Sequence, residues 1–478
     1  MKKLSFFLVF MLCLPLFLVG CEAQEKKLNS YKISAIYDDQ MKTLTCEQEV
    51  DFCNQTENAL QNLSFFLYAN SFAEGQNVVS KSNFNKAYPN GESYGNITIT
   101  NAQINGCECT FFVNDKQTIL SVNLLQELFP DESVKIQLEY VVRLANINHR
   151  LGYGDDTTNL ANFFPILCVY ENGFVKNDFS QCGDPFYSDI ADFEVKLTFP
   201  KDYVVASSGD CVMKNDTQLL VKAEKVRDFA IVLSKKFQVL TEEMEDIEVR
   251  YYFYDDGEAQ FHLQTAKNAM KCFCEMFGTY PYKQVSVVQN DFCFGGMEYP
   301  NLVMISDQVQ NKDIDYVIVH ELAHQWWYGL VGNNEFAESW LDESLTEYSC
   351  ALFFEKHAEY GLRYETIIQN AHDTYTNFVK VYTEILGDVD ESMNRILSQF
   401  NTEPEYVNCI YTKGVLLYDC LRQNVGDKKF FKCLKDYCSA FKFQNATTEK
   451  LVSSFAYSTG RNLISIFDAW LDGRVSIQ

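Results

Sequence analysis

Residues 320–324 read His320-Glu321-Leu322-Ala323-His324, and eighteen residues separate His324 from Glu343. On a helix the two histidines lie one turn apart, so both imidazoles leave the same face. Two imidazole nitrogens and one carboxylate oxygen make a three-ligand zinc site whose fourth position stays open. A water in that position loses a proton near neutral pH. Glu321 lies beside the ligands, so we expect it to accept that proton.

A five-residue pattern of this kind also arises by chance, so its surroundings decide how it is interpreted. The segment that supplies the carboxylate is rich in aromatic and acidic residues, Trp340-Leu341-Asp342-Glu343. Apolar residues flank the histidines on both sides: Ile314, Val317, Ile318, Trp326, Trp327 and Tyr328. Such a stripe is typical of an amphipathic helix that packs on a core. The context therefore favours a metal centre over a coincidence.

The composition predicts a large globular protein. The chain has 478 residues, of which 47% are hydrophobic and 15% aromatic, enough for two or three domains with buried cores. Its formal net charge is −25. Such a surface repels nucleic acid, so we expect no nucleic-acid partner. The acidic balance itself needs no explanation beyond solubility.

The N-terminus is typical of a targeting segment. Lys2 and Lys3 precede an apolar run, residues 4–20, that ends in Leu18-Val19-Gly20-Cys21. A small residue before a cysteine at this place resembles the bacterial lipobox. The resemblance implies a signal peptide over residues 1–20, a lipid on Cys21 and a tether over residues 21–30. We therefore expect an exported protein, anchored on the extracytoplasmic side of a bacterial cell membrane. A plain signal peptide or an uncleaved anchor helix is the alternative.

The cysteines leave two interpretations open. Of the 17 cysteines, Cys13 lies in the leader and Cys21 would be lipidated, which leaves 15. Because 15 is odd, at least one thiol has no intrachain partner. The others either form disulfides, as an exported protein allows, or serve as small buried hydrophobic residues. The pairs Cys107/Cys109 and Cys272/Cys274 lack a second pair at zinc-finger spacing, so we interpret them as structural.

Hydrophobic periodicity divides the chain into two parts. Alternating apolar residues, as at positions 134–140 and 193–199, indicate strands between about residues 28 and 240. The sequence predicts an all-β domain, a sandwich or saddle-like sheet, over residues 31–240. Residues 247–253 form one more strand beyond a charged stretch. From there the pattern predicts a helix at 260–277, a strand at 284–289, the zinc helix at 313–329 and mostly helices after it. This is an α+β arrangement over residues 241–478.

Two further segments carry polar groups suited to a peptide substrate. Gly295-Gly296-Met297-Glu298-Tyr299-Pro300 follows the strand near residue 288. Glycines at a sheet edge let another backbone approach, so a peptide could pair there as an added strand. The carboxylate of Glu298 is then a partner for a cationic amine. Tyr411 opens a late helix, where its hydroxyl could donate to an oxyanion at the metal, and Tyr406 is a rival for that role.

Together these motifs resemble the M1 family of zinc aminopeptidases, across most of the mature chain. The His-Glu-x-x-His pattern with its distant glutamate matches, as do the family's Gly-x-Met-Glu motif at Gly295–Glu298 and its Tyr-x-Lys-Gly motif at Tyr411–Gly414. The resemblance implies a β domain followed by a thermolysin-like catalytic domain. It also implies an aminopeptidase activity on peptides with a free N-terminus.

The resemblance also implies a role for each matched residue. One zinc ion per chain would be bound by His320, His324 and Glu343. Glu321 would act as the general base and Tyr411 would stabilise the tetrahedral intermediate. The substrate would be bound by Glu298, which would hold the α-amine, together with Gly295, Gly296 and Met297.

The chain departs from the family pattern in three places. Tyr299 replaces the asparagine that usually follows the motif glutamate, and no convincing amine-site glutamine or glutamate precedes Phe163-Phe164-Pro165. The chain also ends soon after Trp470, which implies a more open cleft. Two other functions stay open: a zinc endopeptidase of the thermolysin type, in which Glu298 is incidental, and a non-catalytic surface lipoprotein that binds peptides.

Overall fold

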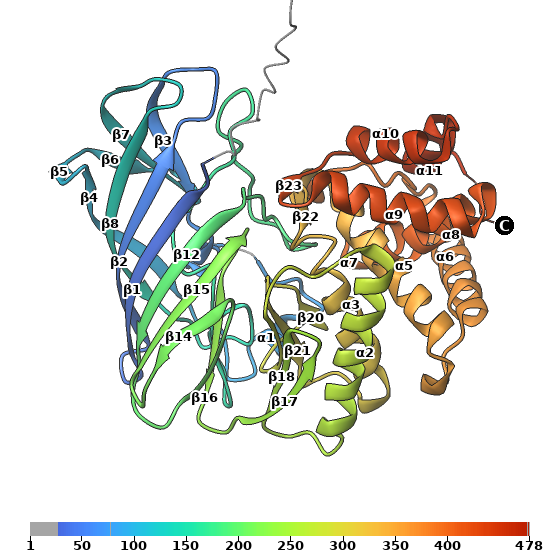
Figure 1. The fold of residues 1–478 in the computed structure, drawn as a ribbon, viewed down its shortest axis with the longest axis horizontal. Helices are drawn as coiled ribbons and strands as arrows, with labels where there is room; N and C mark the ends of the chain where they lie inside the picture. Colours follow the sequence, from blue (N-terminus) through green and yellow to red (C-terminus); the bar gives the residue numbers. More distant parts are fainter. Residues whose placement is uncertain (1–26, 77, 476, 478) are drawn as a thin grey trace, which may run out of the picture.

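The computed structural model describes residues 27–76, 78–475 and 477, so the predicted leader and Cys21 lie outside the described residues. Figure 1 shows a β-rich unit, formed by the first half of the chain, beside a helical unit formed by the second half. This confirms the predicted fold class. No helix within the described ranges combines the length and the apolar character needed to cross a membrane.

The β-rich unit is built on one eight-stranded sheet. Its spatial order is β14 (Asp210–Lys214), β15 (Gln218–Val226), β12 (Ala191–Thr198), β1 (Asn29–Asp38), β2 (Thr43–Cys53), β8 (Ser133–Arg143), β4 (Asn96–Ile104) and β5 (Cys107–Glu108). The strands are antiparallel except that β1 and β12 run parallel. Burial alternates along β8 and β12, with the predicted apolar residues on the core side.

Two smaller sheets complete this unit. One has the order β13 (Val204–Ser207), β16 (Ala230–Ser234), β10 (Thr158–Ala161) and β9 (Leu151–Tyr153). The other has the order β11 (Ile166–Leu167), β3 (Leu60–Phe66), β7 (Ile119–Leu128) and β6 (Phe111–Val113). The aromatic side chains of Phe65, Phe163 and Phe164 are at most 1% exposed in the shared core. The 3-10 turn η1 (Tyr68–Phe72) contributes residues to the main cavity, and the short helix α1 (Phe84–Ala87) follows it along the chain.

The second unit begins with a five-stranded sheet. Its order is β17 (Gln238–Met244), β18 (Ile247–Phe253), β19 (Gln284–Asn290), β21 (Leu302–Ser306) and β20 (Gly296–Met297). Strands β18, β19 and β21 are parallel, and α2 (Ala259–Phe277) connects the first two. Every residue of β19 is buried, as expected for a central parallel strand. The glycine-containing β20 lies at the edge of the sheet.

Helices follow the sheet. They are α3 (Asn311–Ala323), α4 (Glu335–Glu338), α5 (Trp340–Lys356), α6 (Tyr364–Leu386), α7 (Glu403–Val407), α8 (Lys413–Val425), α9 (Asp427–Phe441), α10 (Thr448–Thr459) and α11 (Ile464–Leu471). A π-helical turn, η4 (Asn408–Thr412), joins α7 to α8, and short 3-10 turns occupy Ala358–Tyr360 and Leu397–Gln399. The strands β22 (Val331–Gly332) and β23 (Gln444–Asn445) pair in parallel.

The metal-bearing helix is shorter than its apolar pattern predicts. The predicted helix runs over residues 313–329, whereas α3 ends at Ala323. Residues after it turn sharply, with the Gln325 N–H bonded to the Leu322 carbonyl and Tyr328 at φ +142°. That backbone angle is incompatible with an α-helix. The tryptophans of this turn are nevertheless buried, which explains why the apolar pattern continues past the helix.

A buried arginine joins the two units. Arg227, in the β-rich unit, is 1% exposed and donates to Asn445 Oδ1 of the helical unit over 2.7 Å. A side chain at Gly332 would place its Cβ 2.0 Å from an Arg227 nitrogen, so only glycine admits the guanidinium there. The contact fixes the relative position of the β-rich unit and the metal helices.

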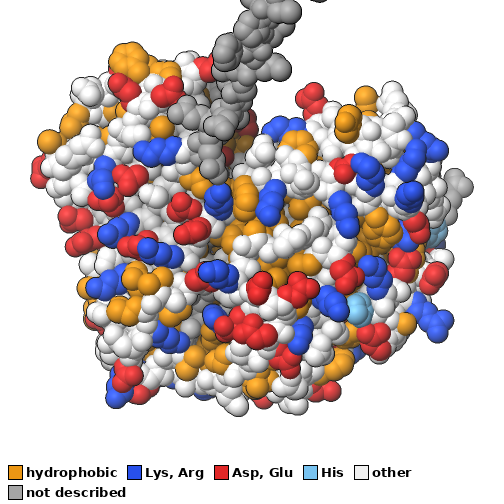
Figure 2. Space-filling model, in the orientation of Figure 1, with side chains coloured by type: hydrophobic (Ala, Val, Ile, Leu, Met, Phe, Trp, Pro, Cys, Tyr) orange, Lys and Arg blue, Asp and Glu red, His pale blue; other side chains and the backbone are white. Residues whose placement is uncertain are grey.

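Charged side chains are mixed over the surface, and most of the described cysteines are buried. Figure 2 shows acidic and basic side chains interspersed over the whole visible face. The fifteen cysteines of the described part are all free, and most of them are buried. The nine buried cysteines pack as small hydrophobic residues, whereas Cys107 and Cys211 are exposed.

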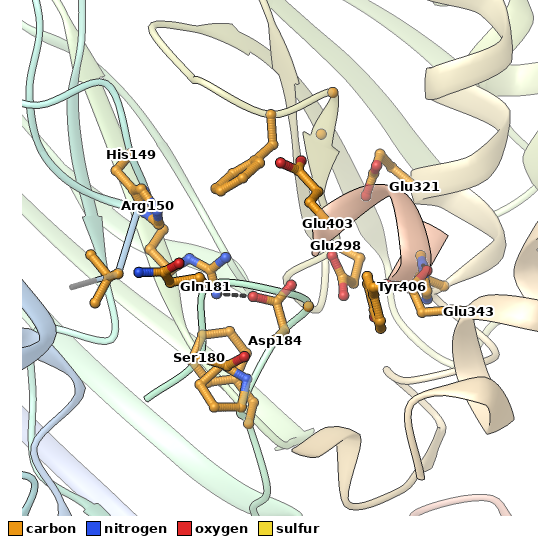
Figure 3. Close-up of a pocket in the computed structure, with 18 of the residues that line it drawn as sticks. His149, Arg150, Ser180, Gln181, Asp184, Glu298, Glu321, Glu343, Glu403 and Tyr406 are labelled. Carbon is orange, nitrogen blue, oxygen red and sulfur yellow. Dashed lines mark hydrogen bonds and ion pairs between the residues drawn. The ribbon is translucent and has the colours of Figure 1, made fainter. Parts of the chain in front are cut away.

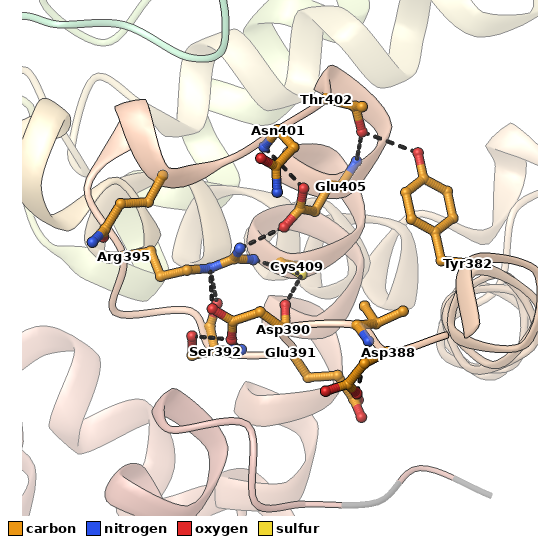
Figure 4. A network of polar contacts seen from close by, with 12 residues as sticks. Tyr382, Asp388, Asp390, Glu391, Ser392, Arg395, Asn401, Thr402, Glu405 and Cys409 are labelled. Atoms are coloured by element: carbon orange, nitrogen blue, oxygen red, sulfur yellow. Dashed lines mark hydrogen bonds and ion pairs between the residues drawn. The ribbon is translucent and has the colours of Figure 1, made fainter. Parts of the chain in front are cut away.

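A polar network orders the segment that leads into η4 (Figure 4). Arg395 and Glu405, each 7% exposed at the side chain, form an ion pair. Glu405 also accepts from the Asn401 N–H over 2.9 Å, and the Arg395 guanidinium lies 3.4 Å from Cys409 Sγ. The network therefore fixes α7 and the π-helical turn, which carry Tyr406 and Tyr411.

We expect Arg395→Ala to destabilise the protein by about 3–5 kcal/mol, because it leaves the Glu405 carboxylate buried without its cation. The measurement is chemical denaturation at neutral pH. The matched control is Arg474→Ala, whose ion pair with Asp472 is 60% and 46% exposed at the two side chains. We expect that exposed pair to contribute about 0–1 kcal/mol. Equal losses in the two variants would contradict a structural role for the buried network.

Candidate metal centre and substrate cleft

Three ligand atoms converge at the end of α3. His320 lies in its last turn, His324 directly follows it, and Glu343 lies in the first turn of α5. His324 Nε2 lies 3.2 Å from His320 Nε2 and 3.2 Å from Glu343 Oε2. His320 Nε2 lies 3.4 Å from the same carboxylate oxygen. The structure thus brings together all three residues that the sequence predicts as ligands.

The triangle fits a small tetrahedral cation. Zinc binds imidazole and carboxylate at about 2.0–2.1 Å, and a tetrahedron with such bonds separates its corners by about 3.3–3.4 Å. The three separations of 3.2–3.4 Å lie at that value. His324 and Glu343 are buried and His320 is partly buried, and their ligand atoms face one another, an arrangement that a cation stabilises.

The other ring nitrogens have partners that orient the imidazoles. His320 Nδ1 lies 2.8 Å from Glu347 Oε2, and His324 Nδ1 lies 2.9 Å from the Trp327 carbonyl. Each Nδ1 thereby carries a proton, and each Nε2 keeps its lone pair for a metal. Sequence reasoning missed Glu347, although it lies one helical turn after Glu343 on α5. The i,i+4 spacing of Glu343 and Glu347 in the sequence could have indicated that both carboxylates lie on the same face of a helix.

Glu321 lies against the glycine edge of the sheet. A Cβ at Gly296 would be 2.3 Å from Glu321 Oε1, so the glycine is required for this close approach. The other carboxylate oxygen, Oε2, is buried and has no hydrogen-bond partner within the described residues. Burial raises the pKa of Glu321 to about 7. A carboxylate in this state accepts and returns protons near neutral pH.

Glu298 lies at the wall of a cavity of about 350 Å³ that also contains the metal triangle (Figure 3). Its side chain is 4% exposed, and Oε1 has no hydrogen-bond partner within the described part of the chain. Burial raises the pKa of Glu298 well above its usual value. A cationic group bound beside it would restore the charged form. Gly295 and Gly296 line the same cavity, whereas Met297 is buried and pairs with Met304 in the sheet.

The β-rich unit contributes an acidic residue that sequence reasoning missed. Asp184 lines the cavity opposite the metal helices and forms an ion pair with Arg150, as Figure 3 shows. Arg150 also lies over the Phe186 ring, 4.9 Å from its centre. Asp184 and Arg150 are 34 positions apart on two loops, so no spacing pattern connects them. Gln181 of the same loop also lines the cavity.

The residue ahead of the Phe163-Phe164-Pro165 segment is Asn162, and it also lines the cavity. Its amide is fully used inside the protein. The Tyr299 hydroxyl donates to Asn162 Oδ1 over 2.5 Å, and Asn162 Nδ2 donates to Asp228 over 2.6 Å. The tyrosine that departs from the family motif therefore anchors the loop that carries Asn162.

Both candidate tyrosines reach the cavity. The Tyr411 ring stacks on the His320 ring with centroids 5.9 Å apart and planes 17° apart. Burial, together with the nearby Glu343 carboxylate, raises the pKa of Tyr411 well above its usual value, so its hydroxyl stays a donor. Tyr406 lies edge-on to Tyr411, 5.8 Å between centroids, and its hydroxyl has no partner within the described residues. Because Tyr411 stacks on His320 of the metal helix, it is better placed than Tyr406 to donate a hydrogen bond to an oxyanion at the metal.

The lysine and glycine after Tyr411 have packing roles. A Cβ at Gly414 would be 2.3 Å from the Ser344 side chain, so α8 approaches α5 closely at this point. Lys413 is fully buried, and its ammonium donates to the Glu391 carbonyl over 2.5 Å. These contacts place the start of α8 directly beside the ligand Glu343.

Comparisons with known proteins agree with this geometry. Residues 261–470 match the peptidase family M1 domain. The chain is 26% identical over 312 residues to the mitochondrial aminopeptidase 2 of Saccharomyces cerevisiae, covering 60% of this chain and 30% of that protein. It is 29% identical over 225 residues to the leukotriene A-4 hydrolase of Xenopus laevis, covering 44% of this chain and 34% of that protein. The chain thus spans about a third of the length of these curated relatives.

A solved structure shares the whole fold. The M1 zinc metallopeptidase from Deinococcus radiodurans superposes with a TM-score of 0.67 at 16% sequence identity, covering 94% of each chain. The donor set of two imidazoles and a carboxylate, together with the family match, identifies the cofactor as zinc. The matched domain and the sequence motifs lead to one conclusion: residues 261–470 form a peptidase family M1 domain.

Proposed function

We propose that this chain is a zinc-dependent aminopeptidase that hydrolyses the first peptide bond of peptides with a free N-terminus. One observation carries the proposal: a buried Glu298 oxygen, which has no hydrogen-bond partner among the described residues, lies in the same cavity as the three-ligand triangle. A structure of a variant of the Deinococcus protein has a Tyr-Ser-Ala substrate bound, and that protein has a TM-score of 0.64 with this chain. This likeness in fold supports a peptide as the substrate.

The chain's own residues bind and orient the substrate in this proposal. His320, His324 and Glu343 would hold the zinc ion, which supplies Lewis acidity that polarises a carbonyl and makes water more acidic. Glu298 and Asp184 would flank the α-amine, so that only the first carbonyl reaches the triangle. The surrounding cavity is rich in carboxylates, and Arg150 is the one arginine or lysine that lines it in the described part of the chain. A cationic N-terminus is therefore favoured there.

Proton transfer would rest on Glu321 and Tyr411. Glu321 removes a proton from the attacking water and returns it to the leaving amine. Tyr411 donates a hydrogen bond to the carbonyl oxygen as negative charge develops on it. Gly296 lets the Glu321 carboxylate lie directly against the sheet edge, where the substrate would bind, because no side chain separates the two. Glu347 keeps His320 oriented through the whole cycle.

The amine-anchoring claim is tested with aminoacyl-arylamides and their N-acetylated counterparts, with and without a chelator. We expect chelator-sensitive cleavage that is confined to the free-amine substrates. For Glu298→Ala we expect kcat/KM on the free-amine substrates to fall roughly 30-fold to 4,000-fold. This corresponds to a loss of about 2–5 kcal/mol of transition-state stabilisation, because the substrate ammonium loses its buried partner. Cleavage of acetylated peptides at a similar rate would instead indicate an endopeptidase. Zinc-loaded protein without any turnover would indicate a binding protein.

The general-base assignment is tested with Glu321→Gln, which preserves shape and removes the proton acceptor. We expect kcat to fall by about 10²–10⁴-fold, while the metal content of the variant stays at the wild-type value. Metal analysis and steady-state kinetics on the same preparation separate the two quantities. Wild-type turnover in a fully metal-loaded variant would assign the base elsewhere.

We further propose that the protein is lipid-anchored through Cys21 and faces outward from a bacterial cell membrane. The support comes from the sequence alone, namely the basic start, the apolar run and Gly20-Cys21. The full chain, expressed in a bacterium, is expected in the membrane fraction, and Cys21→Ser should prevent lipidation. Intact mass of the purified protein is the measurement. A mass without acyl chains would exclude the anchor.

A further inference from the structure

One surface of the helical unit is basic, although the formal net charge of the chain is −25. Residues 427–461, which include α9, β23 and α10, contain seven lysines and arginines against three acidic residues. Lys428, Lys432 and Lys435 are exposed and follow one another on α9 at spacings of four and three. They therefore lie along one face of the helix, and the opposite face packs on the core through Phe430 and Leu434. Several lysine and arginine side chains lie over α9 and α10 in Figure 2.

The neighbouring helix α10 adds an exposed aromatic residue to these lysines. Tyr457 is 88% exposed, although an aromatic ring gains free energy by leaving water. It lies close to the lysines, because Asp436 both pairs with Lys432 and accepts a hydrogen bond from Ser458, the residue after Tyr457. Lysine stems with charged heads, together with a tyrosine ring, are side chains suited to the interface of a lipid bilayer. We call this surface the α9–α10 face; it consists of Lys428, Lys432, Lys435 and Tyr457.

The proposed anchor brings one end of the molecule close to a membrane. Five residues, 22–26, separate Cys21 from Lys27, the first described residue. A chain of that length spans at most about 20 Å. Figure 1 shows the start of β1 and the helices α10 and α11 at the same end of the molecule, the upper end in that view. A lipid on Cys21 would therefore hold the end that carries α10 near the bilayer surface.

We propose that the α9–α10 face docks on the anionic surface of the membrane that holds the anchor, with the Tyr457 ring among the lipid headgroups. The inference rests on the lipid anchor proposed above and adds the orientation of the protein to it. An anionic bilayer repels the rest of this acidic chain but attracts exposed lysines that lie within a Debye length of its surface. The tether raises the effective concentration of the face at the bilayer, so a few such contacts suffice to orient the protein.

The test uses the full chain, purified with its acyl groups and reconstituted in vesicles of brominated phosphatidylglycerol and phosphatidylcholine in equal parts. Brominated lipids quench tryptophan fluorescence on contact. Tyr457→Trp introduces a tryptophan on the α9–α10 face. The matched control is Met41→Trp, a 69% exposed position in the turn between β1 and β2, at the opposite end of β1 from Lys27. After subtraction of the wild-type emission, we expect the signal added by Tyr457→Trp to be at least halved and the signal added by Met41→Trp to be unchanged.

A charge-reversed variant tests the contribution of the lysines in the Tyr457→Trp background. Each lysine at an anionic bilayer strengthens the contact about fivefold, so reversal of three lysines should weaken the docked state about 100-fold and abolish the quenching. High salt should reduce the quenching in the unreversed protein for the same reason. The reversed residues are Lys428→Glu, Lys432→Glu and Lys435→Glu.

The matched control for charge reverses three exposed lysines of the β-rich unit, Lys196→Glu, Lys201→Glu and Lys236→Glu, and changes the net charge by the same amount. We expect this control to keep the quenching. The proposal is overturned if acylated protein shows no quenching at position 457, equal quenching at positions 41 and 457, or equal losses in the two charge-reversed variants. Intact mass separates this failure from failure of the anchor, because a chain without acyl groups would contradict the anchor on which the inference rests.

Discussion

The structure depends on three ligand atoms, of His320, His324 and Glu343, that lie within 3.2–3.4 Å of one another at the junction of α3 and α5. Holding them together in a mostly buried place costs solvation free energy unless a cation, a proton or a metal ion, lies among them. With zinc among them, the same contacts join a helix end, a turn and a second helix. The sharp turn after α3 serves this junction, since it brings the Trp327 carbonyl onto His324. Folding of this region and metal binding are therefore expected to be coupled.

The cleft contains buried oxygens that have no hydrogen-bond partner among the described residues. Arg395 and Arg227 are buried but have several partners. In the cleft, by contrast, buried oxygens of Glu298 and Glu321 and the Tyr406 hydroxyl have no partner among the described residues. Unsatisfied groups of this kind reduce stability and are kept where a ligand completes them.

Sequence reasoning succeeded where local geometry decides position. The spacing of His320 and His324 fixes two ligands on one helix, and alternation fixes the strands β8 and β12. It failed for contacts between distant segments. The Arg150–Asp184 pair and the Tyr299–Asn162 bond join loops that no periodic pattern relates. The end of α3 was also misjudged, because buried aromatic residues continue through the turn that breaks the helix.

The central claim is that His320, His324 and Glu343 hold one zinc ion. Zinc content, measured by mass spectrometry on dialysed wild type and His324→Ala protein and combined with X-ray absorption at the zinc edge, tests it directly. The account predicts about one zinc per wild-type chain, ligands of nitrogen and oxygen type at about 2.0–2.1 Å, and a loss of the ion in the variant. Sulfur ligands around the zinc would contradict this assignment, and so would a His324→Ala variant that retains zinc as tightly as the wild type.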